Sequence, residues 1–152
     1  MSEPLPSIIA EIDIERPVAV VWEIMTSEAT VPQWLGCMAY RREIGAVFYM
    51  QPDAARRGQG DVTGATHCRI DRLDPPARFA FAWFVPGTPE TMVTITLSPD
   101  SARRTRVRLT HDGWEQFPPE MVKPFHDQLK SGWASGVLPG LKTAAERTFS
   151  SR

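Results

Sequence analysis

The chain has 152 residues, of which 42% are hydrophobic and 23% are charged, and this balance suits one globular domain. Its formal net charge of -1 provides no field that would attract nucleic acid or an anionic membrane. No stretch approaches the roughly 20 apolar residues of a membrane span, and the first residues lack the pattern of a secretion signal. We therefore expect a cytoplasmic protein without membrane insertion.

The first predicted element is a strand over residues 8–14, where apolar side chains occupy every second position. Pro17 ends this strand and suits the first turn of a helix. The apolar residues that follow at helical spacing are Val18, Val21, Trp22 and Met25. These positions predict a first helix that breaks at Thr26-Ser27.

A short second helix is predicted from Glu28 to about Leu35. Ser27 is expected to cap its start, because a serine hydroxyl can accept a hydrogen bond from the first free backbone N–H groups. Gly36 is expected to close it.

The segment from Tyr40 to Asp112 has no helical periodicity and predicts consecutive antiparallel strands. A polar loop is expected over residues 52–60, and prolines or glycines separate the later strands. The strands are expected at 46–50, about 62–73, 79–85, 91–97 and 105–111, with a turn over 98–104. Apolar and charged residues alternate in the last strand, which predicts a sheet covered on one side only.

The last predicted element is a long helix over about 119–147, opened by Pro118 and Pro119. Its buried face is expected to carry the apolar residues spaced three or four apart, which are Val122, Phe125, Leu129, Trp133 and Val137. Pro139 is expected to kink or interrupt the helix, because its ring clashes with the carbonyl four residues earlier.

The order of one strand, two helices, about six strands and a long helix resembles the helix-grip superfamily, which includes START lipid carriers, aromatase/cyclases and pollen allergen-like proteins. Four segments are similar to the family named for the C-terminal domain of the activator of the Hsp90 ATPase: VWEIMTSEATVPQWLG, IDRLDPPARFAFAW, TMVTITLSPDSARRTRVRLTHDGW and HDQLKSGWASGVLPGLKTAAE. The similarity covers nearly the whole chain. Its most specific part places Pro75-Pro76, Arg78 and Trp83 in register with His111-Asp112-Gly113-Trp114 and Gly132-Trp133.

The resemblance implies a single α+β domain over residues 1–152. In this fold a curved antiparallel sheet of about six to seven strands wraps around a long C-terminal helix, with two short helices after the first strand. Closing a bent sheet over a helix leaves space between them, and we expect an apolar cavity there. The residues expected to line it are Trp22, Met25, Trp34, Met38, Phe48, Met50, Phe81, Trp83, Val93, Ile95, His111, Trp114, Phe125, Leu129 and Trp133.

Two alternatives stay open for these aromatic and methionine residues. They supply surface for a flat apolar ligand, yet such residues also fill ordinary cores. Alternation in the strand 79–84 puts Phe79, Phe81 and Trp83 on one face and two alanines on the other. We interpret Phe81 and Trp83 as facing the cavity, whereas the opposite assignment would create an exposed protein-binding surface.

The polar residues give little support for catalysis. His111 ends an apolar strand and could act as an acid or base, although a histidine bonded to backbone is the interpretation that we favour. Tyr49, Asp112 and Glu23 could converge with it, as the cyclase relatives would imply. No GxSxG, HExxH or phosphate-binding glycine motif is present, so we assign no catalytic residue.

Metal and redox chemistry are also unsupported. Cys37 and Cys68 lack paired spacing and are expected to be buried free thiols. His67 is expected on the surface of a strand, and His126 is expected to face solvent. No two histidines have metal-ligand spacing, so we predict neither a metal nor a cofactor.

Three functions are compatible with these observations. The leading hypothesis is a monomer or homodimer that binds a small hydrophobic molecule without covalent chemistry. A stress-response module that contacts an Hsp90-type chaperone is the first alternative, and it rests on resemblance alone. The relatives that stimulate the ATPase use an additional N-terminal domain that is not among these 152 residues. A polyketide cyclase-like enzyme that uses His111 is the second alternative.

Overall fold

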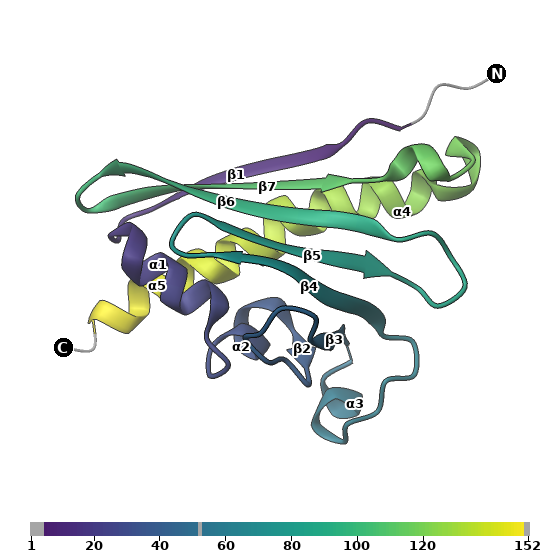
Figure 1. The fold of residues 1–152 in the computed structure, drawn as a ribbon, viewed down its shortest axis with the longest axis horizontal. Helices are drawn as coiled ribbons and strands as arrows, with labels where there is room; N and C mark the ends of the chain where they lie inside the picture. The colour runs from purple at the N-terminus through teal and green to yellow at the C-terminus, as the bar shows by residue number, and fades with distance from the viewer. Residues whose placement is uncertain (1–4, 52, 151–152) are drawn as a thin grey trace.

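A computed structural model describes residues 5–51 and 53–150. In these residues seven antiparallel strands form one sheet in the order β1-β7-β6-β5-β4-β3-β2 (Figure 1). The strands are β1 (Ile8–Ile14), β2 (Cys37–Met38), β3 (Val47–Met50), β4 (Thr66–Asp74), β5 (Arg78–Phe84), β6 (Thr91–Ser101) and β7 (Arg104–Asp112). The first two strands therefore form opposite edges, and the chain meanders back from β2 until β7 pairs with β1.

The helices pack mainly on one side of the sheet, where α4 and α5 run diagonally behind the strands in Figure 1. They are α1 (Val18–Thr26), α2 (Val31–Leu35), α3 (Ala54–Gly58), the 3₁₀ turn η1 (Trp114–Gln116), α4 (Pro119–Gly132), the π-turn η2 (Trp133–Val137) and α5 (Leu138–Ser150). This arrangement confirms the expected α+β helix-grip fold. In the described part of the chain, no helix combines the length and hydropathy that crossing a membrane requires.

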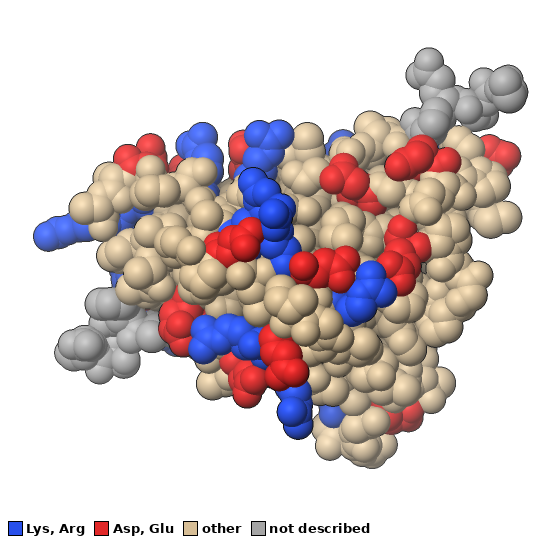
Figure 2. Space-filling view, viewed as in Figure 1, with Lys and Arg blue, Asp and Glu red and all other residues tan. Residues whose placement is uncertain are grey.

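The core lies between the sheet and the helices, and alternate strand residues point into it. Along β6 the buried side chains are Thr91, Val93, Ile95 and Leu97. The opposite face is polar, as ion pairs between Asp13 and Arg106 and between Glu11 and Arg108 connect β1 to β7. Figure 2 shows positive and negative side chains interspersed over this face. The expectation of a sheet covered on one side is therefore confirmed.

The long C-terminal helix continues past Pro139 because the turn before it is wider than an α-turn. In an α-helix the proline ring would clash with the carbonyl of Ser135. Instead, the N–H of Leu138 donates to the oxygen of Trp133, which closes a π-turn and inserts one residue. The stripe that faces the sheet accordingly jumps by five positions and consists of Val122, His126, Leu129, Trp133, Leu138, Leu141 and Ala145.

This stripe corrects two expectations about the helix. Phe125 is 62% exposed, and the adjacent His126 takes the buried position expected for an apolar residue. His126 was expected to face solvent, but it is 5% exposed and its Nε2 donates to the carbonyl of Pro6 at 2.7 Å. Val137 is only half-buried, because the π-turn moves the buried position on to Leu138.

The predicted second helix is wrong at its start. Ser27 ends α1, and its hydroxyl accepts a hydrogen bond from the N–H of Ala29 at 3.2 Å in the turn before α2, but the N-cap position of α2 is Thr30. The α2 helix begins at Val31 instead of Glu28.

The segment after β3 also differs from its prediction. Residue 52 of the expected loop lies outside the described residues, and Asp53 caps the unexpected α3 by accepting from the N–H of Arg56 at 3.0 Å. The next strand begins at Thr66 rather than Val62, because the side chain of Gln51 bonds carbonyls of residues 61 and 63 and holds them outside the sheet. β6 extends to residue 101, so the turn into β7 is shorter than expected.

We predict that Gly113→Ala lowers the free energy of unfolding by about 2–3 kcal/mol. Gly113 has φ 107, and an added Cβ would lie 3.0 Å from the Cα of Thr91. Gly87→Ala is the matched control, since Gly87 has φ 89 with nothing within 4 Å and should lose only the backbone contribution of about 1–2 kcal/mol. Urea unfolding measures both variants, and equal losses would show that the contact with Thr91 contributes nothing.

Candidate functional site

His111 is the centre of a hydrogen-bonded network at one end of the sheet. Its side chain is completely buried, and Trp133 Nε1 in η2 donates to His111 Nδ1 at 3.2 Å. Because Nδ1 accepts, the ring proton lies on Nε2, which donates to Thr91 Oγ1 at 2.7 Å. The hydroxyl of Thr91 then donates to the carbonyl of Trp83 at 2.6 Å. This chain of hydrogen bonds ties the C-terminal helix to the base of the β5–β6 hairpin.

Three indoles enclose the imidazole and form what we call the tryptophan cage. The ring centroids of Trp83, Trp114 and Trp133 lie 5.2, 4.8 and 6.0 Å from that of His111. Burial among these rings, and to a smaller extent the nearby His126, lowers the pKa of His111 to about 3. The imidazole is therefore neutral, and both of its nitrogens are engaged inside the protein.

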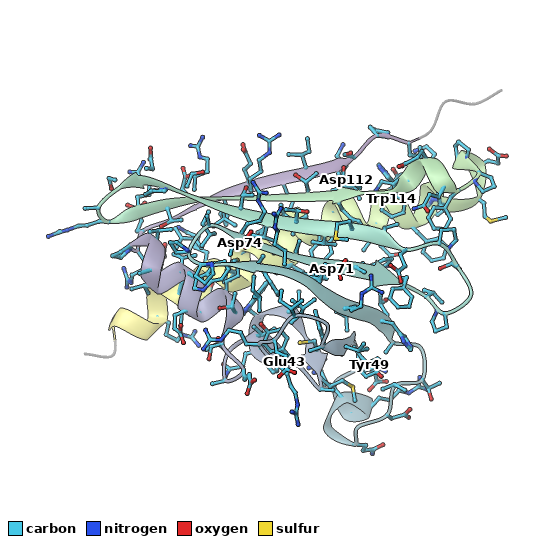
Figure 3. All side chains as sticks on the ribbon, viewed as in Figure 1. Glu43, Tyr49, Asp71, Asp74, Asp112 and Trp114 are labelled. Atoms are coloured by element: carbon cyan, nitrogen blue, oxygen red, sulfur yellow. The ribbon has the colours of Figure 1, made fainter. Side chains whose placement is uncertain are left out.

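The convergence of acid/base groups on His111 that the cyclase relatives would imply is not found. Tyr49 lies on β3, which is four strand steps from β7 and thus about 19 Å away along the sheet. Glu23 pairs with Arg42 at 3.0 Å, and Asp112 accepts a hydrogen bond from the hydroxyl of Ser7. Figure 3 shows Tyr49 and Asp112 on separate parts of the molecule.

An apolar groove of about 480 Å³ lies beside the tryptophan cage. One wall is the end of β5 with the loop that leads to β6, and the other is η1 with the first turns of α4. Figure 3 marks Trp114, which belongs to both the cage and the groove. The large apolar residues of its lining are Trp83, Phe84, Val85, Trp114, Phe117, Met121, Val122 and Phe125.

The groove has the size and the walls of a ligand site. Its volume falls in the range of about 300–1,000 Å³ that small-molecule pockets occupy. Val85, Met121 and Phe125 at its walls are 49%, 66% and 62% exposed, so water covers apolar surface that a ligand could cover instead. Of the residues expected to line a cavity, the groove contains Trp83, Trp114 and Phe125.

The other expected cavity residues lie elsewhere. Met25, Phe48, Phe81, Val93 and Ile95 are fully buried, and Trp22 and Trp34 belong to the same core on α1 and α2. Met38, Met50 and Leu129 are half-buried, whereas His111 and Trp133 belong to the cage. The buried apolar residues among them belong to the core between the sheet and the helices, whereas the groove lies at one end of the sheet. Phe81 and Trp83 do point to the helix side of the sheet.

Sequence reasoning missed the residues that come from connections. Thr88 and Pro89 lie between two predicted strands, Gln116 and Phe117 precede the predicted last helix, and Met121 lies in its first turn, and none of them was predicted to line a site. The available signal was Phe117, a large apolar residue directly before Pro118 that no strand or helix pattern required.

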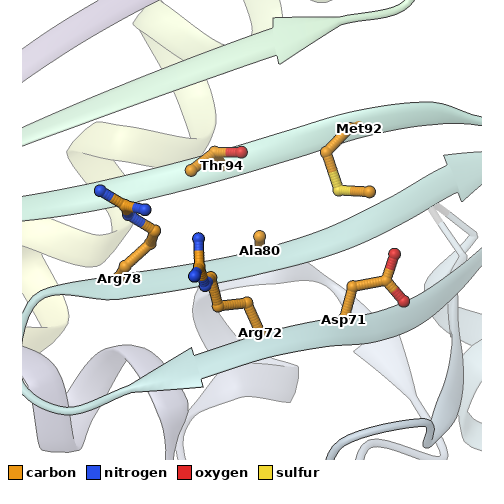
Figure 4. Close-up of a pocket in the computed structure, with 6 residues that line it drawn as sticks. All are labelled: Asp71, Arg72, Arg78, Ala80, Met92 and Thr94. Atoms are coloured by element: carbon orange, nitrogen blue, oxygen red, sulfur yellow. The ribbon is translucent and has the colours of Figure 1, made fainter.

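A second depression, of about 470 Å³, lies on the outer face of the sheet (Figure 4). Ala80 forms its floor, with Arg72 and Arg78 at one end and Asp71 and Met92 at the other. The small side chain of Ala80 leaves this face hollow, as alternation in β5 predicts. Arg72 pairs with Asp74 at 2.7 Å on the solvated surface, and we regard the depression as part of the charged face.

Both cysteines are free and buried, as expected. Burial raises the pKa of the Cys37 thiol to about 12, although Arg57 opposes the shift, so the reactive thiolate is disfavoured. His67 is half-buried on the outer face, where its ring lies 4.9 Å from that of Tyr49. Among the described residues, no group of His, Cys, Asp or Glu side chains could hold a metal ion.

Comparison with known proteins gives one family match. The family model described as "Activator of Hsp90 ATPase homolog 1-like protein" matches residues 15–144. It agrees with the resemblance expected from the sequence. None of the curated proteins compared with the chain matches it.

Solved structures show the same fold. Protein MLL2253 from Mesorhizobium loti is 20% identical with a TM-score of 0.75, and the match covers 94% of this chain and 98% of that one. DynU16, a protein of the dynemicin biosynthetic locus, is 26% identical with a TM-score of 0.72 over 94% of this chain and 48% of that one. An Hsp90 activator from Plasmodium falciparum is 15% identical with a TM-score of 0.68, over 90% of this chain and 94% of that one.

We predict that His111 makes the protein less stable as the pH falls. The pKa of His111 is about 3 in the folded protein, against an ordinary value of 6.5, so the unfolded chain takes up a proton first. The contribution of His111 is complete above about pH 6.5 and declines by about 1.4 kcal/mol per pH unit as the pH falls towards 3.

The measurement compares urea unfolding of the wild type and His111→Gln between about pH 7 and pH 4. Carboxylates titrate in both proteins, so the difference in unfolding free energy isolates His111. The advantage of the wild type should shrink by about 2 kcal/mol or more over this interval. A constant difference would show that His111 has the same pKa in the folded and the unfolded protein.

Proposed function

The chain belongs to the family of activator of Hsp90 ATPase homologue 1-like proteins, and from this premise we propose that it binds a small hydrophobic molecule in the apolar groove. The groove itself is the observation that carries the proposal. Its walls are mainly aromatic and aliphatic, and its volume of about 480 Å³ suits a ligand of two or three rings. The proposed site thus lies at the end of the helix rather than beneath its middle.

The tryptophan cage favours binding because it holds one end of the groove rigid. Trp83 and Trp114 line the groove, and Trp114 Nε1 donates to the carbonyl of His111 at 2.9 Å. Side chains that are fixed before binding lose less conformational entropy when a ligand arrives. At about 0.3 kcal/mol per atom, a ligand of about 20 atoms would gain about 6 kcal/mol, which corresponds to a Kd of some tens of micromolar.

We expect the neutral fluorescent probe N-phenyl-1-naphthylamine to bind the wild type, and Phe125→Ala to weaken its binding by about 3–10-fold. Phe125 contributes apolar surface to the groove, and removal of that surface from the interface costs about 1 kcal/mol. Probe fluorescence titration measures the affinity.

Ile44→Ala is the matched control for this experiment. Ile44 is 59% exposed, much like Phe125 at 62%, but it lies between β2 and β3 and outside the groove. Equal losses in both variants would place the probe elsewhere. Absence of any bound molecule in a native mass spectrometry screen of neutral apolar compounds would refute the proposed function.

Contact with an Hsp90-type chaperone is a second candidate. The family description supports it, and so does the exposed pair formed by Met121 and Phe125, which lie one helical turn apart on α4. Exposed apolar side chains of this kind mark surfaces where proteins bind one another. The similar Plasmodium structure is described as an Hsp90 activator, but at 15% identity it supports the fold alone.

We expect the wild type to be retained on an immobilised Hsp90-type chaperone if this second candidate is correct, and Met121→Glu to lose at least 10-fold in affinity. A buried carboxylate without a partner is costly in an apolar interface. Ile44→Glu provides the control, since it places the same charge on an equally exposed apolar residue elsewhere. No retention of the wild type would end this candidate.

A further inference from the structure

The polar side chains on the hairpin side of the groove have donated their hydrogens inside the protein. The hydroxyl of Thr88 donates to the carbonyl of Val85 at 2.7 Å, and that of Thr91 donates to the carbonyl of Trp83 at 2.6 Å. A hydroxyl has one hydrogen to give, so neither residue can donate to a ligand without losing its bond. Thr91 also accepts from His111, while the oxygen of Thr88 keeps a lone pair.

The same holds on the helical side of the groove. Gln116 Nε2 donates to the carbonyls of Glu90 and Gly113 at 2.7 and 3.0 Å, which uses both hydrogens of the amide. Trp114 Nε1 donates to the carbonyl of His111. Trp83 Nε1 has no partner among the described residues, but other atoms cover it completely, so it does not open into the groove.

Gln116 leaves one strong acceptor available. Its two N–H bonds fix the plane of the amide against the β5–β6 loop. The Oε1 of this exposed side chain forms no hydrogen bond within residues 5–51 and 53–150. The side chains of the groove therefore offer acceptors at Gln116 and Thr88 and no free donor.

The groove also offers no positively charged partner to an anionic ligand. None of the lining residues that the structure describes is charged. The nearest charged side chains along the chain give an anion no positive partner, because Glu115 and Glu120 are carboxylates, and the nearest cation, Lys123, bonds Asp127 at 2.8 Å. A carboxylate or phosphate in the groove would lose water without gaining a donor, and burial of an unpaired charge is strongly unfavourable.

We propose that the groove selects an uncharged apolar molecule that carries a hydroxyl or N–H donor, and that this donor bonds Gln116 Oε1. The inference rests on the proposed function, because it specifies the chemistry of a ligand in the same groove. In a methyl ether of similar shape, the ether oxygen and Gln116 Oε1 are both acceptors and cannot bond each other. Gln116 Oε1 would then have no hydrogen-bond donor once the ligand excludes water. A site that accepts a hydrogen bond therefore rejects the analogue without the donor.

The test compares three compounds of one shape by isothermal titration calorimetry near pH 7: 4-hydroxybiphenyl, 4-methoxybiphenyl and biphenyl-4-carboxylate. The phenol remains neutral there, because its pKa is about 10. We expect the hydroxyl compound to bind at least 5-fold more tightly than the methyl ether, and the carboxylate to bind at least 50-fold more weakly than the hydroxyl compound.

Gln116→Met then locates the acceptor. It keeps the length of the side chain but removes Oε1, so the ratio between the affinities of the hydroxyl compound and the ether should fall to about 1. Gln128→Met, an exposed glutamine of α4 outside the groove, should keep the wild-type ratio. If Gln116→Met does not fold, the compound series on the wild type still decides the class of ligand.

The outcomes separate the two proposals. Binding of the biphenyls with equal affinity for the phenol and the ether, or preference for the carboxylate, would overturn the inference and leave the proposed function standing. An unchanged ratio in folded Gln116→Met would also overturn it. Binding of none of the three would overturn the proposed function and the inference together.

Discussion

The buried, neutral imidazole of His111 fixes how the C-terminal helix packs on the sheet. His111 can satisfy both of its nitrogens only if Trp133 approaches from the helix and Thr91 from the hairpin. A buried polar group without partners is costly, so the helix cannot rotate or slide without breaking this arrangement. The groove is a consequence, because the same contacts fix Trp83 and Trp114 at its inner end while the exposed start of α4 stands apart from the hairpin loop.

The helix shows where sequence periodicity succeeds and where it stops. Its existence, its approximate length and its place across the sheet could be predicted, because prolines open it and apolar residues repeat along it. The identity of the buried face could not. Phe125 and His126 fit the repeat equally well, and the choice fell on His126 because Pro6, distant in the sequence, accepts its ring proton. The π-turn before Pro139 then displaced the later positions by one residue.

The site shows a similar limit. Alternation in β5 predicted which aromatic rings face the helix. The large aromatic side chains in the sequence led to the prediction that Trp83 and Trp114 line a ligand site, and both line the groove. Whether an aromatic side chain fills space or borders it depends on how tightly its neighbours pack, and composition carries no information on that point. Phe81 and Phe48 touch edge to face at 5.4 Å and close the interior, whereas Trp83, two residues along the same strand, reaches the opening. The remaining wall comes from turns, which have no periodicity to read.

The order of strands in the sheet indicates the order in which strand pairs can form during folding. Every contact from β2 to β7 joins neighbours in sequence, so these hairpins can assemble locally as the chain emerges. β1 precedes the other described strands in sequence, but its sole neighbour in the sheet that the structure describes is β7. Pairing of β1 with β7 closes the loop that contains all the strands between them, and the entropy cost of that closure is offset only when the pair forms. The segment that contains β1 therefore docks late, and the apolar groove, which includes residues of α4, forms only after α4 has been made.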